Sequence, residues 1–141
     1  MQKTLTVATV VCAACAVSAY ARGETYTLDQ VLDAIATVES RNDPCAVGDD
    51  GRAVGAYQIH ERYWTDVRRI LKVDWPYADA KDPVKARAAV RAYVQRYAQR
   101  YGQRPSVWAR VHNGGPRGPL KGNTQKYWIK VRDELRRSSG R

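Results

Sequence analysis

Four acidic residues lie close together in the sequence and are of the type that cleaves glycosidic bonds. Glu39 follows Ile35 by four residues, so it lies on or beside the apolar face of an expected helix. Asp43, Asp49 and Asp50 follow in a glycine-containing turn. Glycoside cleavage requires one carboxyl that stays protonated near neutral pH and a second that stays ionised. Because burial raises the pKa of a carboxyl, Glu39 suits the first role and an aspartate of the exposed turn suits the second.

The same residues also have a plainer interpretation. Glu39 can be a helix-end carboxylate and the aspartates ordinary turn formers, and spacing alone favours this structural interpretation. Other catalytic patterns are weaker. Ser40 has no histidine at an obvious position for a triad. His60, His112 and the lone Cys45 do not have a zinc-binding spacing, so we expect no metal and no cofactor.

The elements that must position these residues are predicted mainly as helices. Thr27 and Gln30 form a capping-box pattern, and apolar residues at helical spacing continue the first helix to about Glu39. Val47 and Ala53-Val54 flank the turn that follows as short strands. Further helices are expected over residues 60–71, 82–101, 105–111 and from Thr124, which we expect to cap the last one. The expected fold is α+β and mainly helical, with about five helices and a small β-hairpin lobe.

The first 21 residues have the pattern of a secretory signal peptide. Lys3 precedes an uncharged stretch rich in Ala and Val that ends in the small-residue pattern Ala19-Tyr20-Ala21. A membrane anchor would be marginal at this length, and lipidation at Cys15 is a less favoured alternative. We expect cleavage after Ala21, a domain over residues 22–135 and a disordered basic tail over residues 136–141. The protein is therefore expected to be secreted or periplasmic.

Removal of the signal peptide leaves Cys45 as the one cysteine of the mature chain. No intrachain disulfide can then form, so the domain must be stabilised by its apolar core. We expect Cys45 to be a small buried residue and not a nucleophile, because no histidine lies close to it in the sequence.

The chain is strongly basic, with 24 Lys and Arg against 14 Asp and Glu and a net charge of +10. This charge attracts polyanions, which outside the cytoplasm include cell-wall polymers, acidic membranes and stray nucleic acid. Export and the scattered placement of the arginines argue against a nucleic-acid partner. Charge alone does not choose among the remaining polyanions, of which an anionic cell-wall surface is one. We expect a monomer with no stable membrane insertion after signal cleavage.

Several stretches of the sequence resemble the invertebrate-type lysozyme family. They are Val38-Glu39-Ser40, Gly55-Ala56-Tyr57-Gln58-Ile59, Tyr63-Trp64-Thr65-Asp66, the run from Trp108 to Gly118 with His112-Asn113-Gly114-Gly115-Pro116, and Tyr127-Trp128-Ile129-Lys130-Val131. The resemblance extends from about Thr27 to Val131, and the second and fourth stretches are its specific parts. It implies a lysozyme-like fold and cleavage of the β-1,4 bond between N-acetylmuramic acid and N-acetylglucosamine in peptidoglycan glycan strands.

The resemblance also implies roles for particular residues. It places the general acid on Glu39 and the second carboxylate in the following turn. That stretch is shorter than in the family, so Asp49 is our first choice and Asp50 the reserve. The implied substrate-binding residues are Tyr57, Gln58, His112, Asn113 and Gly114. For Gln58 a structural hydrogen bond between the lobes is an equal alternative, and His112 can simply close the turn after its helix.

Alternatives to hydrolysis stay open at this point. The same landmarks are more distantly similar to lytic transglycosylases, which use a single glutamate and form an anhydro sugar without water. A non-enzymatic cationic cell-wall-binding or antimicrobial protein on the same scaffold would not need Glu39. Members of the resembled family sometimes also cleave isopeptide bonds, and nothing in this sequence singles out that activity.

Overall fold

The computed structural model describes residues 25–140, so the predicted signal peptide and Cys15 lie outside the described residues and stay predictions. The elements in chain order are α1 (Leu28–Ser40), β1 (Val47–Gly48), η3 (Asp49–Gly51), β2 (Ala53–Val54), β3 (Ile59–His60), α2 (Glu61–Leu71), η4 (Tyr77–Lys81), α3 (Pro83–Ala98), α4 (Pro105–Gly114), η5 (Gly115–Leu120) and α5 (Thr124–Ser139). This composition confirms the expected mainly helical α+β fold with a small antiparallel sheet.

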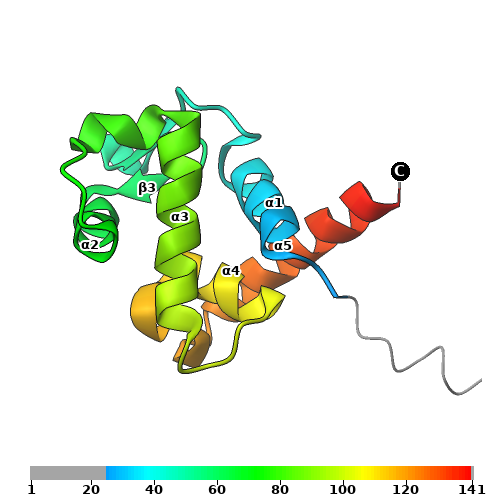
Figure 1. The fold of residues 1–141 in the computed structure, drawn as a ribbon. Helices are drawn as coiled ribbons and strands as arrows, with labels where there is room; N and C mark the ends of the chain where they lie inside the picture. The colour runs from blue at the N-terminus through cyan, green and yellow to red at the C-terminus, as the bar shows by residue number, and fades with distance from the viewer. Residues whose placement is uncertain (1–24, 141) are drawn as a thin grey trace, which may run out of the picture.

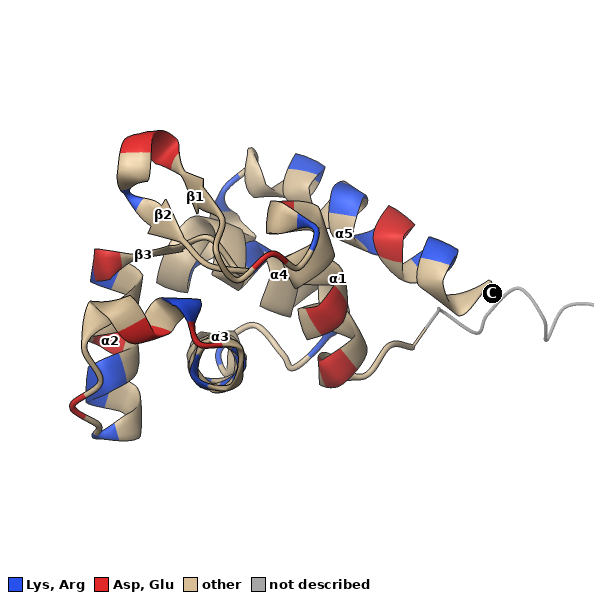
Figure 2. Cartoon of the chain, turned by 90° about the horizontal axis from the view of Figure 1, so that it is seen from above, with Lys and Arg blue, Asp and Glu red and all other residues tan. Residues whose placement is uncertain are grey.

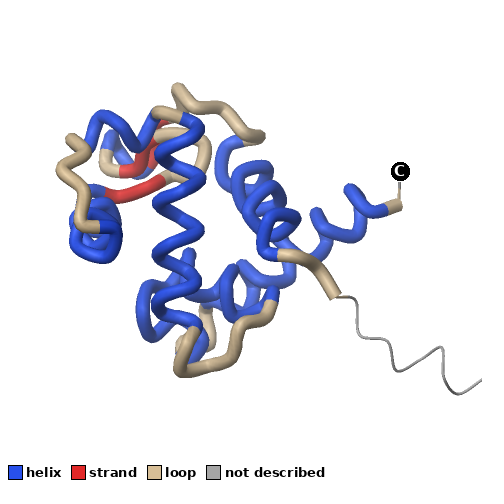
Figure 3. The backbone as a smooth tube through the Cα atoms, viewed as in Figure 1, coloured by secondary structure: helices blue, strands red, loops and turns tan. Residues whose placement is uncertain are grey.

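The helix α3 runs through the middle of the molecule (Figure 1). The β lobe and α2 lie on one side of it, and α1 and α5 lie on the other. Figure 3 shows the three short strands confined to the lobe, while helices make up most of the rest of residues 25–140. The helix α4 packs against both α3 and α5, and thereby connects the central helix to the side of the molecule that holds α5.

The first helix forms where the sequence predicted it. The Thr27 backbone N–H donates to the Gln30 side chain at 2.8 Å, and the Thr27 hydroxyl accepts from the Gln30 backbone N–H at 3.3 Å. This reciprocal pair satisfies two donors that the helix start would otherwise leave free. The apolar face of the helix is fully buried at Val31, Leu32 and Ile35, and each such side chain contributes about 2 kcal/mol by its burial. The face that carries Glu39 is therefore held against the core.

The β lobe is a three-stranded antiparallel sheet in the order β1-β2-β3. Val47 pairs with Val54, as the predicted hairpin requires, but the third strand was not predicted. That strand is only two residues long, and sequence reasoning assigned its last residue to the following helix. Gly55 lets the lobe pack closely against η4. Any larger residue would clash, because a Cβ at this position would lie 2.3 Å from the Ala80 carbonyl oxygen.

The later helices are confirmed, with different ends. Asp82 caps α3 and accepts from two backbone N–H groups at 2.9 Å, but the helix ends at Ala98 and not near residue 101. The helix α4 continues to Gly114, beyond the expected end at residue 111. Thr124 does not cap α5, because its hydroxyl is buried against the carbonyl oxygens of the preceding turn, and Asn123 occupies the cap position.

Two expectations were wrong in detail. Cys45 is exposed, because the Asp43 carboxylate accepts from the Cys45 backbone N–H at 2.8 Å and turns the chain outward there. The disordered tail was expected to begin at residue 136, but α5 continues to Ser139. An ion pair of 2.8 Å between Arg137 and Glu134 and a hydrogen bond from Ser138 to Glu134 stabilise this last turn.

Within residues 25–140, no helix combines the length and apolar character that crossing a membrane requires.

Candidate active site

A cavity of about 380 Å³ lies between the β lobe and the helices. Residues from both sides line it, namely Glu39, Asp49, Ala53, Gln58, His60, Tyr63, His112, Asn113 and Gly115. Five of these were singled out from the sequence, in which they lie between residues 39 and 113. The turn η3, which carries acidic residues, joins β1 and β2 at the tip of the lobe (Figure 2). Asp49 of this turn and Glu39 of α1 both line the cavity.

Glu39 is the penultimate residue of α1 and turns its carboxylate into this cavity. Tyr127 donates to Glu39 Oε1 at 2.7 Å, and Nε2 of His112 lies 3.4 Å from the same oxygen. The side chain is 20% exposed, so it is mostly buried and still reaches the cavity. The neighbouring Ser40 hydroxyl donates to the Ala56 carbonyl oxygen at 2.9 Å, which ties the end of α1 to the lobe. Contacts of Glu39 itself and of the adjacent Ser40 therefore both fix the position of the carboxylate.

The pKa of Glu39 differs from the sequence expectation. Burial raises this pKa, but the hydrogen bond and charge of His112 and the hydrogen bond from Tyr127 together outweigh burial. The net pKa of Glu39 is lowered below its ordinary value, whereas a raised pKa was expected. Reasoning from burial alone missed this because the two hydrogen-bonding partners lie far from Glu39 in the sequence.

His112 lies between Glu39 and a group of aromatic rings. Its side chain is 5% exposed, and its Nδ1 is 3.2 Å from the Tyr63 hydroxyl. These contacts fit a Tyr63 hydroxyl that donates to Nδ1 and an Nε2–H that donates to Glu39. Tyr63 stacks on Tyr93 with ring centroids 3.6 Å apart. Burial raises the pKa of Tyr63 well above its ordinary value, so its hydroxyl keeps its proton and can donate.

Asp49 faces the same cavity from the exposed turn of the lobe. Its carboxylate is 2.8 Å from Nε2 of His60, and its side chain is 60% exposed. Asp49 and Asp50 both have positive φ, 49° and 54°, a conformation that aspartate tolerates better than most residues. Asp49 therefore has a solvated, hydrogen-bonded setting, and Glu39 has a mostly buried one.

Gln58 combines the two interpretations that its sequence context left open. Its side-chain N–H donates to the Gly55 carbonyl oxygen at 3.0 Å, which is a structural bond within the lobe. The same side chain lines the cavity and packs so closely on Gly48 that a Cβ there would lie 2.2 Å from its oxygen. Its φ of 48° is unusual for glutamine, which indicates backbone strain at the cavity wall.

Three predicted residues do not line the cavity. Tyr57 is buried, and its hydroxyl accepts from Arg87 of α3 at 3.3 Å. Gly114 faces α5, since a Cβ there would lie 2.6 Å from a methyl group of Thr124, and Gly115 lines the cavity in its place. Asp50, the reserve for the second carboxylate, is not among the lining residues, whereas Asp49 is.

Sequence reasoning missed His60, Tyr63 and Tyr127 as site residues. His60 follows Gln58 by two residues, so strand alternation would have placed both side chains on one face. Tyr63 and Tyr127 belong to stretches that carried the family resemblance, but helical periodicity assigned Tyr63 to an apolar face. Glu39, Asp49, His60 and His112 are of metal-ligand type, yet within residues 25–140 no three such side chains come close enough to hold an ion.

The chain is similar in sequence to known proteins. The sequence model of the Destabilase family matches residues 28–134. The lysozyme of Meretrix lusoria is 34% identical over 112 residues, which are 71% of this chain and 84% of that protein.

Solved structures agree with the sequence match. The crystal structure of Aeromonas hydrophila PliI in complex with Meretrix lusoria lysozyme contains a chain that is similar to this one with a TM-score of 0.66 and 32% identity, covering 79% of this chain and 93% of that chain. The crystal structure of Tapes japonica lysozyme is similar with a TM-score of 0.61 and 28% identity, covering 72% of this chain and 85% of that chain.

The fold and these matches thus define a protein of the lysozyme class. The chain belongs to the Destabilase family, the invertebrate type of lysozyme.

Proposed function

We propose that this protein is an exported muramidase that hydrolyses the β-1,4 bond between N-acetylmuramic acid and N-acetylglucosamine in peptidoglycan. The observation that supports this most directly is the pairing of Glu39 and Asp49 across one cavity in opposite environments. Glycoside hydrolysis needs two carboxyl groups that differ in this way.

Glu39 is the general acid of the proposed mechanism. Tyr127 and His112 both contact Oε1, so Oε2 is the oxygen assigned to protonate the glycosidic oxygen. In the empty cavity these contacts favour the carboxylate, since they lower its pKa. A bound glycan displaces water from the cavity, and this desolvation raises the pKa toward the protonated form that the reaction requires.

Asp49 is the second carboxylate. Its carboxylate lies 2.8 Å from Nε2 of His60, and it stabilises the positive charge that develops on the sugar ring, or attacks that ring, or positions the water that does. Gln58 and Asn113 supply amide groups on two walls of the cavity, where they are suited to hydrogen-bond acetamido and hydroxyl groups of the glycan.

Isopeptide cleavage is less well supported by this site. The Ser40 hydroxyl contacts the Ala56 carbonyl oxygen and accepts from the Asp43 backbone N–H at 2.9 Å, so it helps to fix the turn. Cys45 is exposed and is not a lining residue of the cavity. The acidic pair favours a glycosidic bond as the bond that is cut.

Mass spectrometry of peptidoglycan digested with the protein tests the proposal. Fragments with reducing ends are expected. Anhydro ends would contradict hydrolysis and indicate transglycosylase chemistry by Glu39 alone. Binding to sacculi with no released fragments would contradict an enzymatic role and indicate a cationic wall-binding protein.

A further inference from the structure

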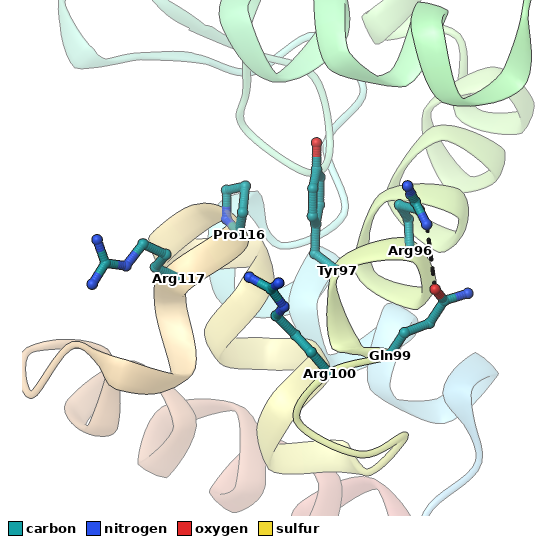
Figure 4. Close-up of a pocket in the computed structure, with 6 residues that line it drawn as sticks. All are labelled: Arg96, Tyr97, Gln99, Arg100, Pro116 and Arg117. Atoms are coloured by element: carbon teal, nitrogen blue, oxygen red, sulfur yellow. Dashed lines mark hydrogen bonds between the residues drawn. The ribbon is translucent and has the colours of Figure 1, made fainter.

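A second cavity of about 430 Å³ lies between the end of α3 and η5. Its lining residues, which we call the arginine pocket, are Arg96, Tyr97, Gln99, Arg100, Pro116 and Arg117. Figure 4 shows Tyr97 standing between the α3 side chains and those of η5, with the Arg100 side chain below its ring. The Arg117 side chain extends outward from the η5 wall. The pocket is therefore a cationic recess around one aromatic ring.

The positive charge of this pocket is not balanced by nearby acids. Among the residues that the structure describes, Arg96 donates to the Gln99 amide oxygen at 3.3 Å, and neither Arg100 nor Arg117 has an ion pair. Earlier on the same helix, Arg87 and Arg91 both pair with the Asp29 carboxylate.

An acid does lie within electrostatic reach of the pocket. Asp66 affects the pKa of Tyr97, but this carboxylate is itself 3.4 Å from Arg69. The arginine pocket thus holds three cations that lack a carboxylate of their own.

The helix dipole explains only part of this arrangement. Arg96 is in the last turn of α3 and Arg100 lies just after it, where positive charge is favoured. Arg117 comes from η5, a separate element, and lines the same pocket. Three like charges brought together from two elements point to an anion that binds among them.

The arginine pocket adjoins the catalytic cavity along two paths. Along the chain, Gly115 lines the catalytic cavity, and the next residue, Pro116, lines the arginine pocket. Through space, Tyr63 of the catalytic cavity stacks on Tyr93, whose ring centroid is 4.8 Å from that of Tyr97. The two cavities therefore lie on either side of a shared wall, which places the pocket next to a polymer held in the catalytic cavity.

We infer that the arginine pocket binds carboxylates of the peptide stem on the glycan strand that occupies the catalytic cavity, an inference that rests on the proposed function. Each N-acetylmuramic acid bears a peptide through its lactyl group, and these peptides carry free carboxylates. Guanidinium groups bind carboxylates through two parallel hydrogen bonds, and the Tyr97 ring offers an apolar face to the peptide. Wall phosphodiesters are a weaker candidate, since they are not attached to every muramic acid of the strand being cut.

Co-sedimentation with insoluble sacculi tests this inference. The protein carries Glu39→Gln, so that the sacculi stay intact during the measurement. One batch of sacculi keeps its phosphodiester polymers and the others are stripped of them. Half of the stripped sacculi are amidated with carbodiimide and ammonium to neutralise their carboxylates. The test variant adds Arg100→Gln and Arg117→Gln. The matched control adds Lys126→Gln and Lys130→Gln, which removes the same charge from exposed positions on α5.

The test variant is expected to bind native sacculi about tenfold more weakly than the control, and to match the control on amidated sacculi. Equal binding of the two variants to native sacculi would overturn the inference. A difference that persists after amidation would also overturn it. A difference seen only on sacculi that retain phosphodiesters would show that the pocket binds phosphate and not stem carboxylates. Failure of the unmutated protein to release fragments would instead contradict the proposed function, while arginine-dependent, amidation-sensitive binding would still support the pocket.

Discussion

The Tyr127 hydroxyl donates a hydrogen bond of 2.7 Å to Oε1 of Glu39, and so joins the first and last helices that the structure describes. His112 of α4 approaches the same oxygen at 3.4 Å. Three helices thus converge on one carboxylate oxygen and fix the side chain that we assign as the general acid. The same contacts lower the pKa of Glu39, so they also set the pH range in which it can act.

Replacement of Tyr127 by Phe removes one contact that lowers the pKa of Glu39 and preserves the packing of the ring. The pKa of Glu39 is expected to rise. Because the general acid must be protonated, the alkaline limb of the kcat/KM profile should shift to higher pH. Tyr57→Phe is the matched control, since its hydroxyl contacts Arg87 outside the cavity. An unchanged alkaline limb in Tyr127→Phe would show that this hydrogen bond does not tune the acid.

The lowered pKa of Glu39 also predicts how stability depends on pH. A carboxyl with a lowered pKa in the folded state stabilises the fold above its unfolded-state pKa, and this stabilisation is lost as the pH falls through its folded-state pKa. Between about pH 6 and about pH 2.5, the free energy of unfolding should therefore fall more for the unmutated protein than for Glu39→Gln. Urea denaturation across this range measures the difference. Parallel curves would contradict the assigned direction of the shift.

The choice between the two aspartates of the turn is tested by Asp49→Asn and Asp50→Asn. Asp49 lines the cavity beside His60, so its replacement should reduce kcat by on the order of 10²-fold or more. Asp50 is not a lining residue, and Asp50→Asn should retain most of the activity. Asparagine tolerates positive φ as aspartate does, so both variants keep the turn. Loss of activity in Asp50→Asn alone would reverse the assignment.

The backbone strain at Gln58 is measurable as stability. Gln58→Ala keeps a Cβ at a φ of 48°, whereas Gln58→Gly removes the Cβ that makes this conformation unfavourable. Both variants lose the side-chain bond to Gly55. The glycine variant should therefore be more stable than the alanine variant by about 1 kcal/mol in chemical denaturation. A more stable alanine variant would show that the strain is absent.

Much of the fold followed from local sequence patterns. The capping box at Thr27, the Asp82-Pro83 start of α3 and the hairpin around residues 48–51 each depend on a few adjacent residues, and each formed as predicted. Glu39 was found because helical spacing places it next to a buried apolar stripe. These features are local, so a single sequence is sufficient to predict them.

The parts that were missed depend on residues that are far apart in the sequence. Tyr127 is 88 residues from Glu39, and no periodicity links the two. The wrong expectation for the pKa of Glu39 followed directly, since burial was visible in the helix pattern and the opposing hydrogen bonds were not. Tyr57 was assigned to the cleft with Gln58, but the positive φ of Gln58 turns the backbone between them, and Tyr57 instead reaches Arg87.

The most direct test of the proposed function compares peptidoglycan cleavage by the unmutated protein and by Glu39→Gln. Glutamine preserves the size of the side chain and cannot supply the proton. Loss of the general acid should slow the release of reducing-end fragments by on the order of 10²–10⁴-fold. Equal rates for the two proteins would contradict the assignment of Glu39 and the mechanism that depends on it.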